Sequence, residues 1–254
     1  MNVFANRKTR ALIFIMCALV LSGIIISHFY YKGINASIDP RVVPARKLYE
    51  RYNQYAQLGQ YDSVLWLLDT IQSTYYDISH YKSSFEVGVL QNNRAATFLT
   101  MGLFDDKIKA EKQDSLMIMA DSCVRKSINL YENWLKAFDS KNEDQIRGII
   151  KEDFLSGLQS FSSEDKERFL KNRIDEIKSA QIETKRRLSV AYTNLGIVNR
   201  YQLQYELAAQ NYKTAIDLWD RNLTAENNLN KLLGRPEKKR NLIQKLFPPE
   251  RVQN

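Results

Sequence analysis

Few side chains of this chain are of the types that carry out catalysis. It has two histidines, His28 and His80, and two cysteines, Cys17 and Cys123, and they do not form a cluster with the spacing of metal ligands. The nine glycines are scattered, and they form neither a phosphate-binding loop nor a nucleophile elbow. Carboxylates are plentiful, but paired acids are ordinary on solvated helix faces. These features predict a protein that is not an enzyme and that uses no cofactor or metal.

The prolines indicate one long helical block. All five lie outside residues 45–235, at Pro40, Pro44, Pro236, Pro248 and Pro249. Proline inside a helix kinks or ends it, so the absence of proline over this length favours uninterrupted helices. We therefore predict an all-α domain over residues 45–234, preceded by a linker at residues 32–44.

Small and large residues alternate at fixed spacings in the second half of this block. The pattern is a bulky pair with a glycine, followed by two alanines around a tyrosine: Tyr192, Leu195, Gly196, Ala208, Tyr212 and Ala215. Two helices that cross closely need small residues at the contact, and larger side chains fill the space on either side. The spacing therefore predicts a helical hairpin.

This pattern resembles one tetratricopeptide (TPR) repeat, the unit of a family of stacked helical hairpins. Weaker copies are found when the glycine between the two helices of a family hairpin is placed at Gly59 and at Gly102. Residues 225–233, which end at Gly234, resemble the final helix that caps such a stack. The resemblance implies an all-α, TPR-like solenoid of helical hairpins. A generic helical hairpin is the alternative.

Residues 139–187 have no TPR match, although apolar side chains recur there at helical spacing. We predict an inserted or degenerate helical hairpin in this segment, and we expect its second helix to run on into the best repeat. Ser140 with Glu143, and Ser162 with Asp165, resemble the start signals of its two helices.

An apolar run precedes the helical block. Residues 11–27 carry no charge, and an aromatic cluster follows at residues 29–31. At ~1.5 Å per residue, a helix over residues 11–31 is long enough to cross a hydrocarbon core of ~30 Å. We predict one N-terminal transmembrane helix at residues 11–31. A cleaved signal peptide is the alternative, because a basic segment at residues 1–10 precedes the run.

Basic residues beside the predicted span indicate its orientation. Arg7, Lys8 and Arg10 stand before it without an acid among them, and the short basic end normally stays in the cytoplasm. We therefore predict a single-pass membrane protein with a cytoplasmic N-terminus. Its C-terminal domain is then outside the cytoplasm, which is the periplasm in a bacterium.

The net charge of +8 does not indicate a nucleic-acid partner, because of where the charges lie. Half of the excess comes from Arg7, Lys8, Arg10 and Lys32, which flank the predicted span. The remainder lies in a basic tail at residues 235–254, where apolar residues are interleaved with basic ones. Such a tail either folds back on its domain or binds a lipid surface or an acidic partner.

In TPR proteins the first helix of each hairpin lines a concave surface that receives peptides or partner helices. The resemblance implies that this surface contains Tyr49, Asn53, Asn92, Asn93, Ala96, Thr193, Asn194, Ile197, Arg200 and Tyr201. Amide side chains there can hydrogen-bond a peptide backbone without requiring one sequence. The alternative is that the asparagines hydrogen-bond between the helices themselves.

Two functions are compatible with these features. The first is a membrane-anchored TPR-like scaffold that binds protein partners or peptides through its concave helical surface, in an envelope, secretion or assembly complex. The second is a surface-binding module whose basic tail engages lipid or an anionic polymer, with the helical block as a rigid spacer.

Overall fold

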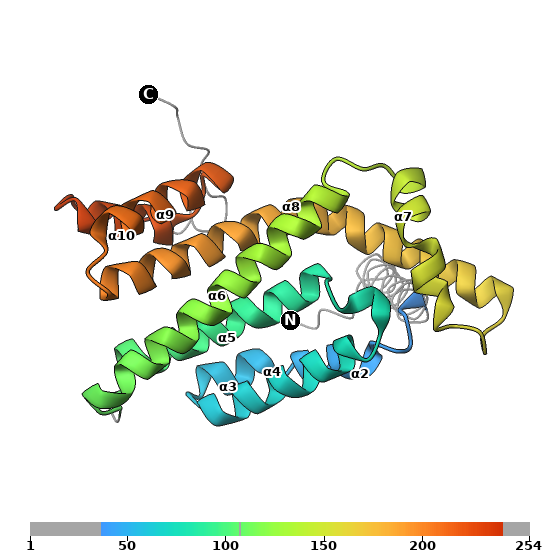
Figure 1. Ribbon diagram of the computed structural model, residues 1–254, viewed down its shortest axis with the longest axis horizontal. Coiled ribbons are helices and arrows are strands. Elements are labelled where there is room, and N and C mark those ends of the chain that lie inside the picture. The colour runs from blue at the N-terminus through green and yellow to red at the C-terminus, as the bar shows by residue number, and fades with distance from the viewer. Residues whose placement is uncertain (1–36, 107, 241–254) are drawn as a thin grey trace, which may run out of the picture.

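Residues 37–106 and 108–240 are described by the structure, a computed structural model (Figure 1). The elements are α2 (Val43–Tyr49), α3 (Tyr52–Gln57), α4 (Tyr61–Tyr76), the short 3₁₀ helix η1 (Ser79–Tyr81), α5 (Phe85–Phe104), α6 (Ala110–Phe138), α7 (Glu143–Ser156), α8 (Ser163–Tyr201), α9 (Tyr205–Leu218) and α10 (Leu223–Leu232). Every regular element within these two ranges is helical, which confirms the predicted all-α class.

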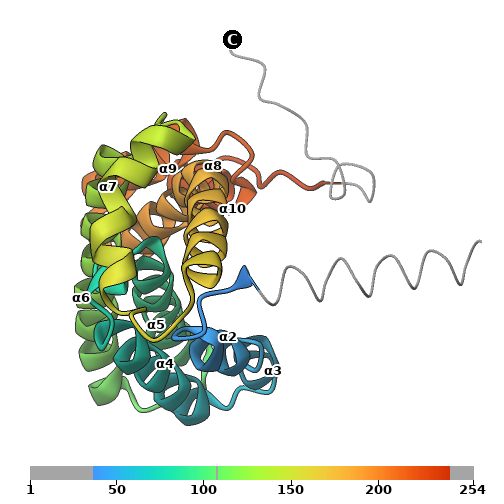
Figure 2. The same ribbon diagram turned by 90° about the vertical axis from the view of Figure 1, so that its right-hand side faces the viewer.

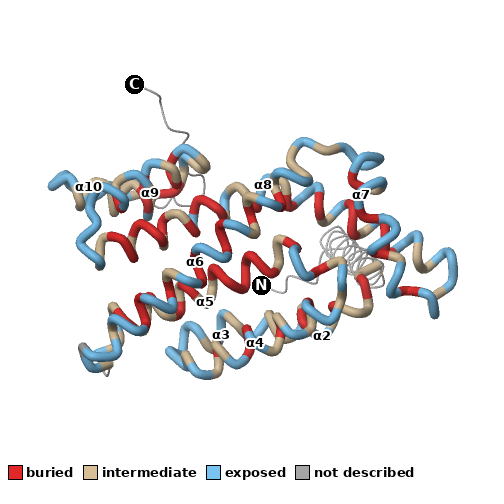
Figure 3. The backbone as a smooth tube through the Cα atoms, viewed as in Figure 1, coloured by how far each residue is buried: buried red, intermediate tan, exposed pale blue. Residues whose placement is uncertain are grey.

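Consecutive helices pack against each other as hairpins. α4 packs on α2 and α3, α6 packs along α5, and α9 packs along α8. Figure 2 shows α6 on one side of the molecule and α2, α3 and α8 on the other. Buried residues follow the facing sides of α5, α6 and α8 (Figure 3), and they form several clusters along the chain. The core therefore extends from hairpin to hairpin.

Two hairpin turns share one backbone geometry. Gly59 follows α3 with a φ of +65°, and Leu203 follows α8 with a φ of +60°. The amide after each of these residues donates to the carbonyl oxygen five positions back, at 3.0 Å in the first turn and 2.9 Å in the second. A left-handed residue with this back bond is the Schellman ending of a helix. Gly59 therefore lies between the two helices of a hairpin, as predicted.

Leu203 adopts this left-handed conformation although it is not a glycine. Leu203→Gly should raise the free energy of unfolding by about 0.5–1 kcal/mol. The left-handed conformation costs an ordinary residue about 1–2 kcal/mol, and glycine avoids this cost. Part of the stabilisation is lost again because glycine gives the unfolded chain more conformational entropy. The Leu203 side chain is 69% exposed, so little packing is lost. Gly59→Ala should lower the same free energy by about 1 kcal/mol. Urea unfolding of the full chain in detergent micelles measures both, and a less stable Leu203→Gly variant would contradict the strain.

Gly102 does not lie in a turn, and its predicted position is wrong. It lies inside α5, where a Cβ atom would clash with Met117 of α6. The glycine permits a close approach of two helices instead of a change of chain direction. α6 already begins at Ala110, so the intervening turn is short.

Two hairpins place a glycine against a tyrosine ring. A Cβ atom on Gly196 would lie 2.5 Å from the ring of Tyr212, as the small residue predicted at a close helix crossing requires. Gly88 of α5 has the same relation to Tyr131 of α6, also at 2.5 Å. Both tyrosines are fully buried. The α5–α6 and α8–α9 hairpins therefore share a packing contact that the sequence pattern revealed only in the second.

α7 and the first half of α8 form the segment without a TPR match. Ser162 caps α8 by accepting a hydrogen bond from Asp165 N at 3.1 Å, as predicted. α7 starts later than predicted, because its cap is Asn142, which exchanges hydrogen bonds with Gln145. Ser140 instead adopts a φ of +60° just after α6. α8 is one continuous helix, so the second helix of this segment does run on into the best repeat.

The segment predicted as a linker is part of the packed domain from residue 37 onward. Asp39 and Val42 are 2% and 0% exposed. At the other end, Lys238 N donates to Asn227 Oδ1 of α10 at 2.8 Å, which holds the first residues of the predicted tail along that helix. The boundaries predicted at 32–44 and at 235 therefore need correction, because these segments find partners on distant helices.

None of the helices in the described ranges combines the length and the apolar character that a membrane crossing requires. The predicted span at residues 11–31 lies outside those ranges, as do residues 241–254 of the tail. The anchor therefore stays a prediction.

Candidate functional site

The residues predicted to bind a partner lie on the first helices of the hairpins. They belong to α2 (Tyr49), α3 (Asn53), α5 (Asn92, Asn93, Ala96) and α8 (Thr193, Asn194, Ile197, Arg200, Tyr201). Asn93 Nδ2 donates to Tyr49 Oη at 2.7 Å, which joins α5 to α2. Asn194 Nδ2 donates to Asn92 Oδ1 at 3.0 Å, which joins α8 to α5. The structure thus links α2, α5 and α8 through three of the predicted asparagines, Asn92, Asn93 and Asn194.

Asn92 and Thr193 are buried, with 8% and 3% of their surface exposed. Thr193 Oγ1 accepts a hydrogen bond at 3.0 Å from Asn222 Nδ2, and Asn222 also caps α10 by accepting from Ala225 N. The prediction that Asn92 and Thr193 face a partner is therefore corrected. They connect α5, α8 and α10, because neighbouring helices cover this side of each helix.

Arg200 and Tyr201 are tied to other helices at the end of α8. Arg200 NH1 lies 3.4 Å from Asn228 Oδ1 of α10, and Tyr201 Oη donates to Asp114 Oδ1 of α6 at 2.9 Å. The remaining predicted residues keep some exposed surface and make no side-chain hydrogen bond within the described part of the chain: Asn53, Ala96 and Ile197. These three are the freest of the set to contact a partner.

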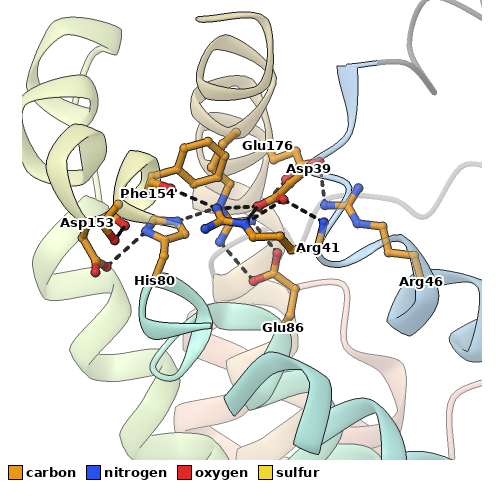
Figure 4. A network of polar contacts seen from close by, with 10 residues as sticks. Asp39, Arg41, Arg46, His80, Glu86, Asp153, Phe154 and Glu176 are labelled. Atoms are coloured by element: carbon orange, nitrogen blue, oxygen red, sulfur yellow. Dashed lines mark hydrogen bonds and ion pairs between the residues drawn. The ribbon is translucent and has the colours of Figure 1, made fainter. Parts of the chain in front are cut away.

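A second polar cluster, which the sequence did not single out, lies where α5, α7 and α8 meet the start of the domain (Figure 4). Its centre is Arg173 of α8, which is 2% exposed. The guanidinium donates to Glu86 Oε1 at 2.5 Å and to Glu176 Oε2 at 3.1 Å, and it lies 4.4 Å from the ring centre of Tyr81. A buried charge is tolerated only when it is paired and hydrogen-bonded, and this cluster meets both conditions.

The protonation states in this cluster follow from burial and pairing. Burial acts to raise the pKa of Glu86, but the charge and the hydrogen bonds of Arg173 outweigh it and hold that pKa below its usual value. Burial acts to lower the pKa of Arg173, but the charges of Glu86, Tyr81 and Glu176 and the hydrogen bond with Glu86 together outweigh burial and hold this pKa well above its usual value. Both partners are therefore ionised at neutral pH.

His80 is the neutral member of the cluster. Burial, together with the charges of Arg173 and Arg41, lowers the pKa of His80 to about 3. Its Nε2 accepts a hydrogen bond from Arg173 Nε at 3.1 Å, which assigns the imidazole proton to Nδ1. Nδ1 lies 3.6 Å from Asp153 Oδ2. His80 therefore orients Arg173 rather than exchanging protons near neutral pH.

The same cluster fastens the first described residues to the domain. Arg41 forms a two-point pair with Asp39, at 3.0 Å and 2.8 Å, and donates to Phe154 O of α7 at 2.9 Å. Arg46 of α2 pairs with Glu176 of α8 at 2.7 Å. The groups in the cluster are paired with one another, so the cluster joins the first described residues and α2 to α5, α7 and α8.

The low pKa of His80 predicts a loss of stability in mild acid. A histidine in the unfolded chain takes up a proton below about pH 6.5, whereas folded His80 does so only near pH 3. Its contribution to stability is therefore complete above pH 6.5 and is lost as the pH falls toward 3. Between pH 6.5 and 5, the free energy of unfolding should fall by about 2 kcal/mol. Urea unfolding at pH 7 and pH 5 measures this fall, and His80→Gln should lose less stability between the two pH values than the wild type does. An equal loss of stability in both proteins would contradict the low pKa of His80.

Two pockets of the described structure are small. A pocket of about 140 Å³ opens beside His80 and Asp153, and one of about 280 Å³ lies between α8 and the end of α9, beside Ile182 and Trp219. Sites for small molecules usually occupy ~300–1,000 Å³. Within the described ranges, His, Cys, Asp and Glu side chains do not gather in groups of three or more that could hold a metal ion.

No family model, curated protein or solved structure matches this chain. The structure does show a similarity between hairpins within the chain itself. The same turn follows α3 and α8, and the same glycine–tyrosine contact joins α5 to α6 and α8 to α9. Its function is therefore inferred from its own hairpins.

Proposed function

We propose that this protein is a membrane-anchored, TPR-like scaffold that binds protein partners or peptides through the face of α2, α3, α5 and α8. The observation that carries the proposal is the repetition of turn and packing contact between hairpins, which puts their first helices side by side. Helices stacked in this way combine their free surfaces into one extended face, to which peptides or partner helices bind. We propose that the scaffold works within an envelope, secretion or assembly complex.

The anchor in this proposal is the predicted span at residues 11–31. Residues 32–36 alone then separate the span from the packed residue 37, and five extended residues reach at most about 18 Å. The contacts of Asp39 and Arg41 would hold the domain close to the membrane surface. With the N-terminus in the cytoplasm, protease added outside should digest the domain without access to the cytoplasm. Protection of the domain, or a mature N-terminus near Ser37, would overturn this topology.

The binding face can be blocked without breaking a hydrogen bond between helices. Asn53 is exposed and Ala96 is half-buried, and neither side chain is tied to another helix within the described ranges. We expect Asn53→Arg combined with Ala96→Arg to weaken partner capture about tenfold or more, which corresponds to about 1.4 kcal/mol, through added bulk and charge. Crosslinking and pull-down of the full chain from membranes measure the capture, and circular dichroism should show unchanged helical content.

The matched control places two arginines on α6, at the exposed positions Ile118 and Ser122. Ile118→Arg with Ser122→Arg adds the same charge to a second helix of a hairpin, so capture should remain normal. If the variant of Asn53 and Ala96 captures every partner as well as this control does, the face does not bind partners.

The alternative function is binding of lipid or an anionic polymer by the basic tail. The observation that favours it is that Lys238 is bonded to Asn227 of α10 and Arg240 to Arg221 O just before that helix, so the start of the tail is held at a defined point of the domain. Deletion of residues 241–254 keeps those contacts. Under the scaffold proposal this deletion removes only salt-sensitive binding, because exposed charges are screened over ~8 Å at physiological ionic strength. Loss of all partners with the tail would favour the alternative.

A further inference from the structure

Asp153 of α7 is a carboxylate of the polar cluster that lacks a cation beside it. The cluster contains four carboxylates and three guanidiniums: Asp39, Glu86, Asp153 and Glu176, and Arg41, Arg46 and Arg173. The three arginines pair with the other three acids. Asp153 faces His80 instead (Figure 4), and His80 is neutral because its Nε2 accepts a hydrogen bond from Arg173. Within the described ranges, the cluster therefore has one carboxylate more than it has cations.

Asp153 lines a pocket of about 140 Å³ that lies between η1, α6, α7 and α8. Most of its other lining side chains are apolar or aromatic: Trp134, Phe138, Ile149, Ile150 and Ile177. Both Asp153 and Ile149 have 49% of their surface exposed, so this end of the pocket is open to solvent. At about 30 Å³ for each water-sized group, the volume holds about five non-hydrogen atoms, as many as a lysine side chain has. The pocket therefore suits a slender apolar chain.

Ser84 supplies a second acceptor in this pocket. It stands just before α5, is 4% exposed, and its Oγ atom makes no hydrogen bond within the described ranges. Burial raises the pKa of Glu86 and Arg173 lowers it, and the Ser84 hydroxyl adds to the lowering, so its proton is directed toward Glu86. The lone pairs of the oxygen are then left to accept a hydrogen bond. A buried oxygen in this state is incomplete without a donor.

Charge favours a cation over an anion in this pocket. Arg173 also lines it, but the guanidinium is 2% exposed and already donates to Glu86, Glu176 and His80. An anion would be repelled by the Asp153 carboxylate at the open end. An ammonium group is attracted there, and its three N–H donors can serve both Asp153 and Ser84.

We propose that this pocket binds a primary alkylammonium group, with Asp153 as the counter-charge of the nitrogen and the apolar wall around the carbon chain. The charged end stays near water while the methylene groups are buried, as is usual for lysine side chains. The group is the lysine side chain of another protein or a free aliphatic amine. This site lies on the helices without a TPR match, away from the face of the proposed scaffold, and does not depend on it.

Butylammonium is the first probe of the site. Thermal unfolding of the full chain in micelles is followed at pH 7 against butylammonium chloride, with sodium chloride keeping the ionic strength constant. A ligand that binds only the folded state raises Tm in a saturable way. We expect this rise with butylammonium. Butanol lacks the charge and tetramethylammonium lacks N–H donors, so neither should produce it. Equal responses to butylammonium and butanol, or no saturable response to butylammonium, would overturn the proposal.

The carboxylate is tested with two variants of α7. Asp153→Asn should weaken apparent butylammonium binding by about tenfold or more, because the counter-charge is lost. Glu152→Gln is the matched control, since it removes one charge from the neighbouring exposed position of the same helix. Its binding should equal that of the wild type. If the two variants bind butylammonium equally well, Asp153 is not the counter-charge.

An ammonium group supplied by the chain itself provides a second measurement. Ile149 lies one turn before Asp153 on the same side of α7 and lines the pocket. Ile149→Lys should therefore occupy the site and abolish the butylammonium response, whereas Ile149→Met, the uncharged match, should keep it. The same response in both variants would show that butylammonium binds elsewhere.

A short peptide identifies the source of the ammonium group. The peptide carries a single lysine among glycines and has both ends blocked. A saturable rise of Tm with this peptide assigns the site to a lysine side chain, and a rise with aliphatic diamines alone assigns it to a free amine. An equal rise with the Nε-acetylated peptide would overturn the need for a charge. The scaffold proposal fails separately, through normal partner capture by the variant of Asn53 and Ala96, and that result leaves the amine measurements unaffected.

Discussion

Replacement of Glu86 by glutamine should lower the free energy of unfolding by about 3–5 kcal/mol. Glu86 accepts from two nitrogens of Arg173, at 2.5 Å and 3.3 Å, and Arg173 is 2% exposed. Glutamine keeps the shape of the side chain but not its charge. The guanidinium would remain buried with Glu176 as its remaining carboxylate partner, at 3.1 Å. Urea unfolding of the full chain in micelles at pH 7 measures the loss.

The matched control is Glu143→Gln, because Glu143 pairs with Lys178 at the surface, where both side chains are largely exposed. Solvent screens such a pair, and no measurable loss is expected. Glu86→Leu combined with Arg173→Met should recover much of the stability, because no charge then stays buried without its partner. If Glu86→Gln is as stable as Glu143→Gln, the buried pair does not stabilise the junction of α5 and α8.

Addition of one methyl group at Gly196 should destabilise the α8–α9 hairpin by about 1–3 kcal/mol. In Gly196→Ala the new Cβ atom would lie 2.5 Å from the ring of Tyr212, and this ring is fully buried, so α9 has to shift. Gly88→Ala should have the same effect through Tyr131. In urea unfolding, the midpoint of both variants should move to a lower urea concentration. The slope of the unfolding free energy against urea concentration should stay unchanged.

Gly148 of α7 is the control position, since a Cβ atom there would meet nothing within 4 Å. Gly148→Ala should stabilise the protein by up to about 1 kcal/mol, because alanine favours a helix over glycine. A gain in Gly196→Ala equal to that in Gly148→Ala would mean that α8 and α9 do not cross closely at Gly196.

The helical class and several helix ends can be predicted because they depend on residues close together in sequence. No proline interrupts residues 45–235, and every regular element described there is helical. Ser162 caps α8 through Asp165, three residues away. Gly59 ends α3 because its own φ of +65° suits glycine. Each of these features follows from backbone geometry and short-range hydrogen bonds.

Other features depend on distant contacts that short spacings do not encode. Glycine is common in turns, but Gly102 lies inside α5. A side chain at this position would clash with Met117 of α6. Asn142 competes with Ser140 for the start of α7 and wins because Gln145 returns a second hydrogen bond. Arg173 lies among buried apolar residues of α8, and this position is the sequence signal from which a buried, paired charge could have been predicted.

The resemblance to a TPR repeat assigned the asparagines of α5 and α8 to the proposed face. The tertiary structure decided that Asn92 and Asn194 bond to each other and that the buried Nε atom of Arg187, on α8, has no acceptor among the described residues. The physical reason is that hydrogen bonds between side chains depend on the distance between helices to within a fraction of an ångström. That distance is set by the packing of glycines and tyrosines across the whole domain, so sequence determines which residue types share a helix face, and only the fold determines which of them remain unpaired.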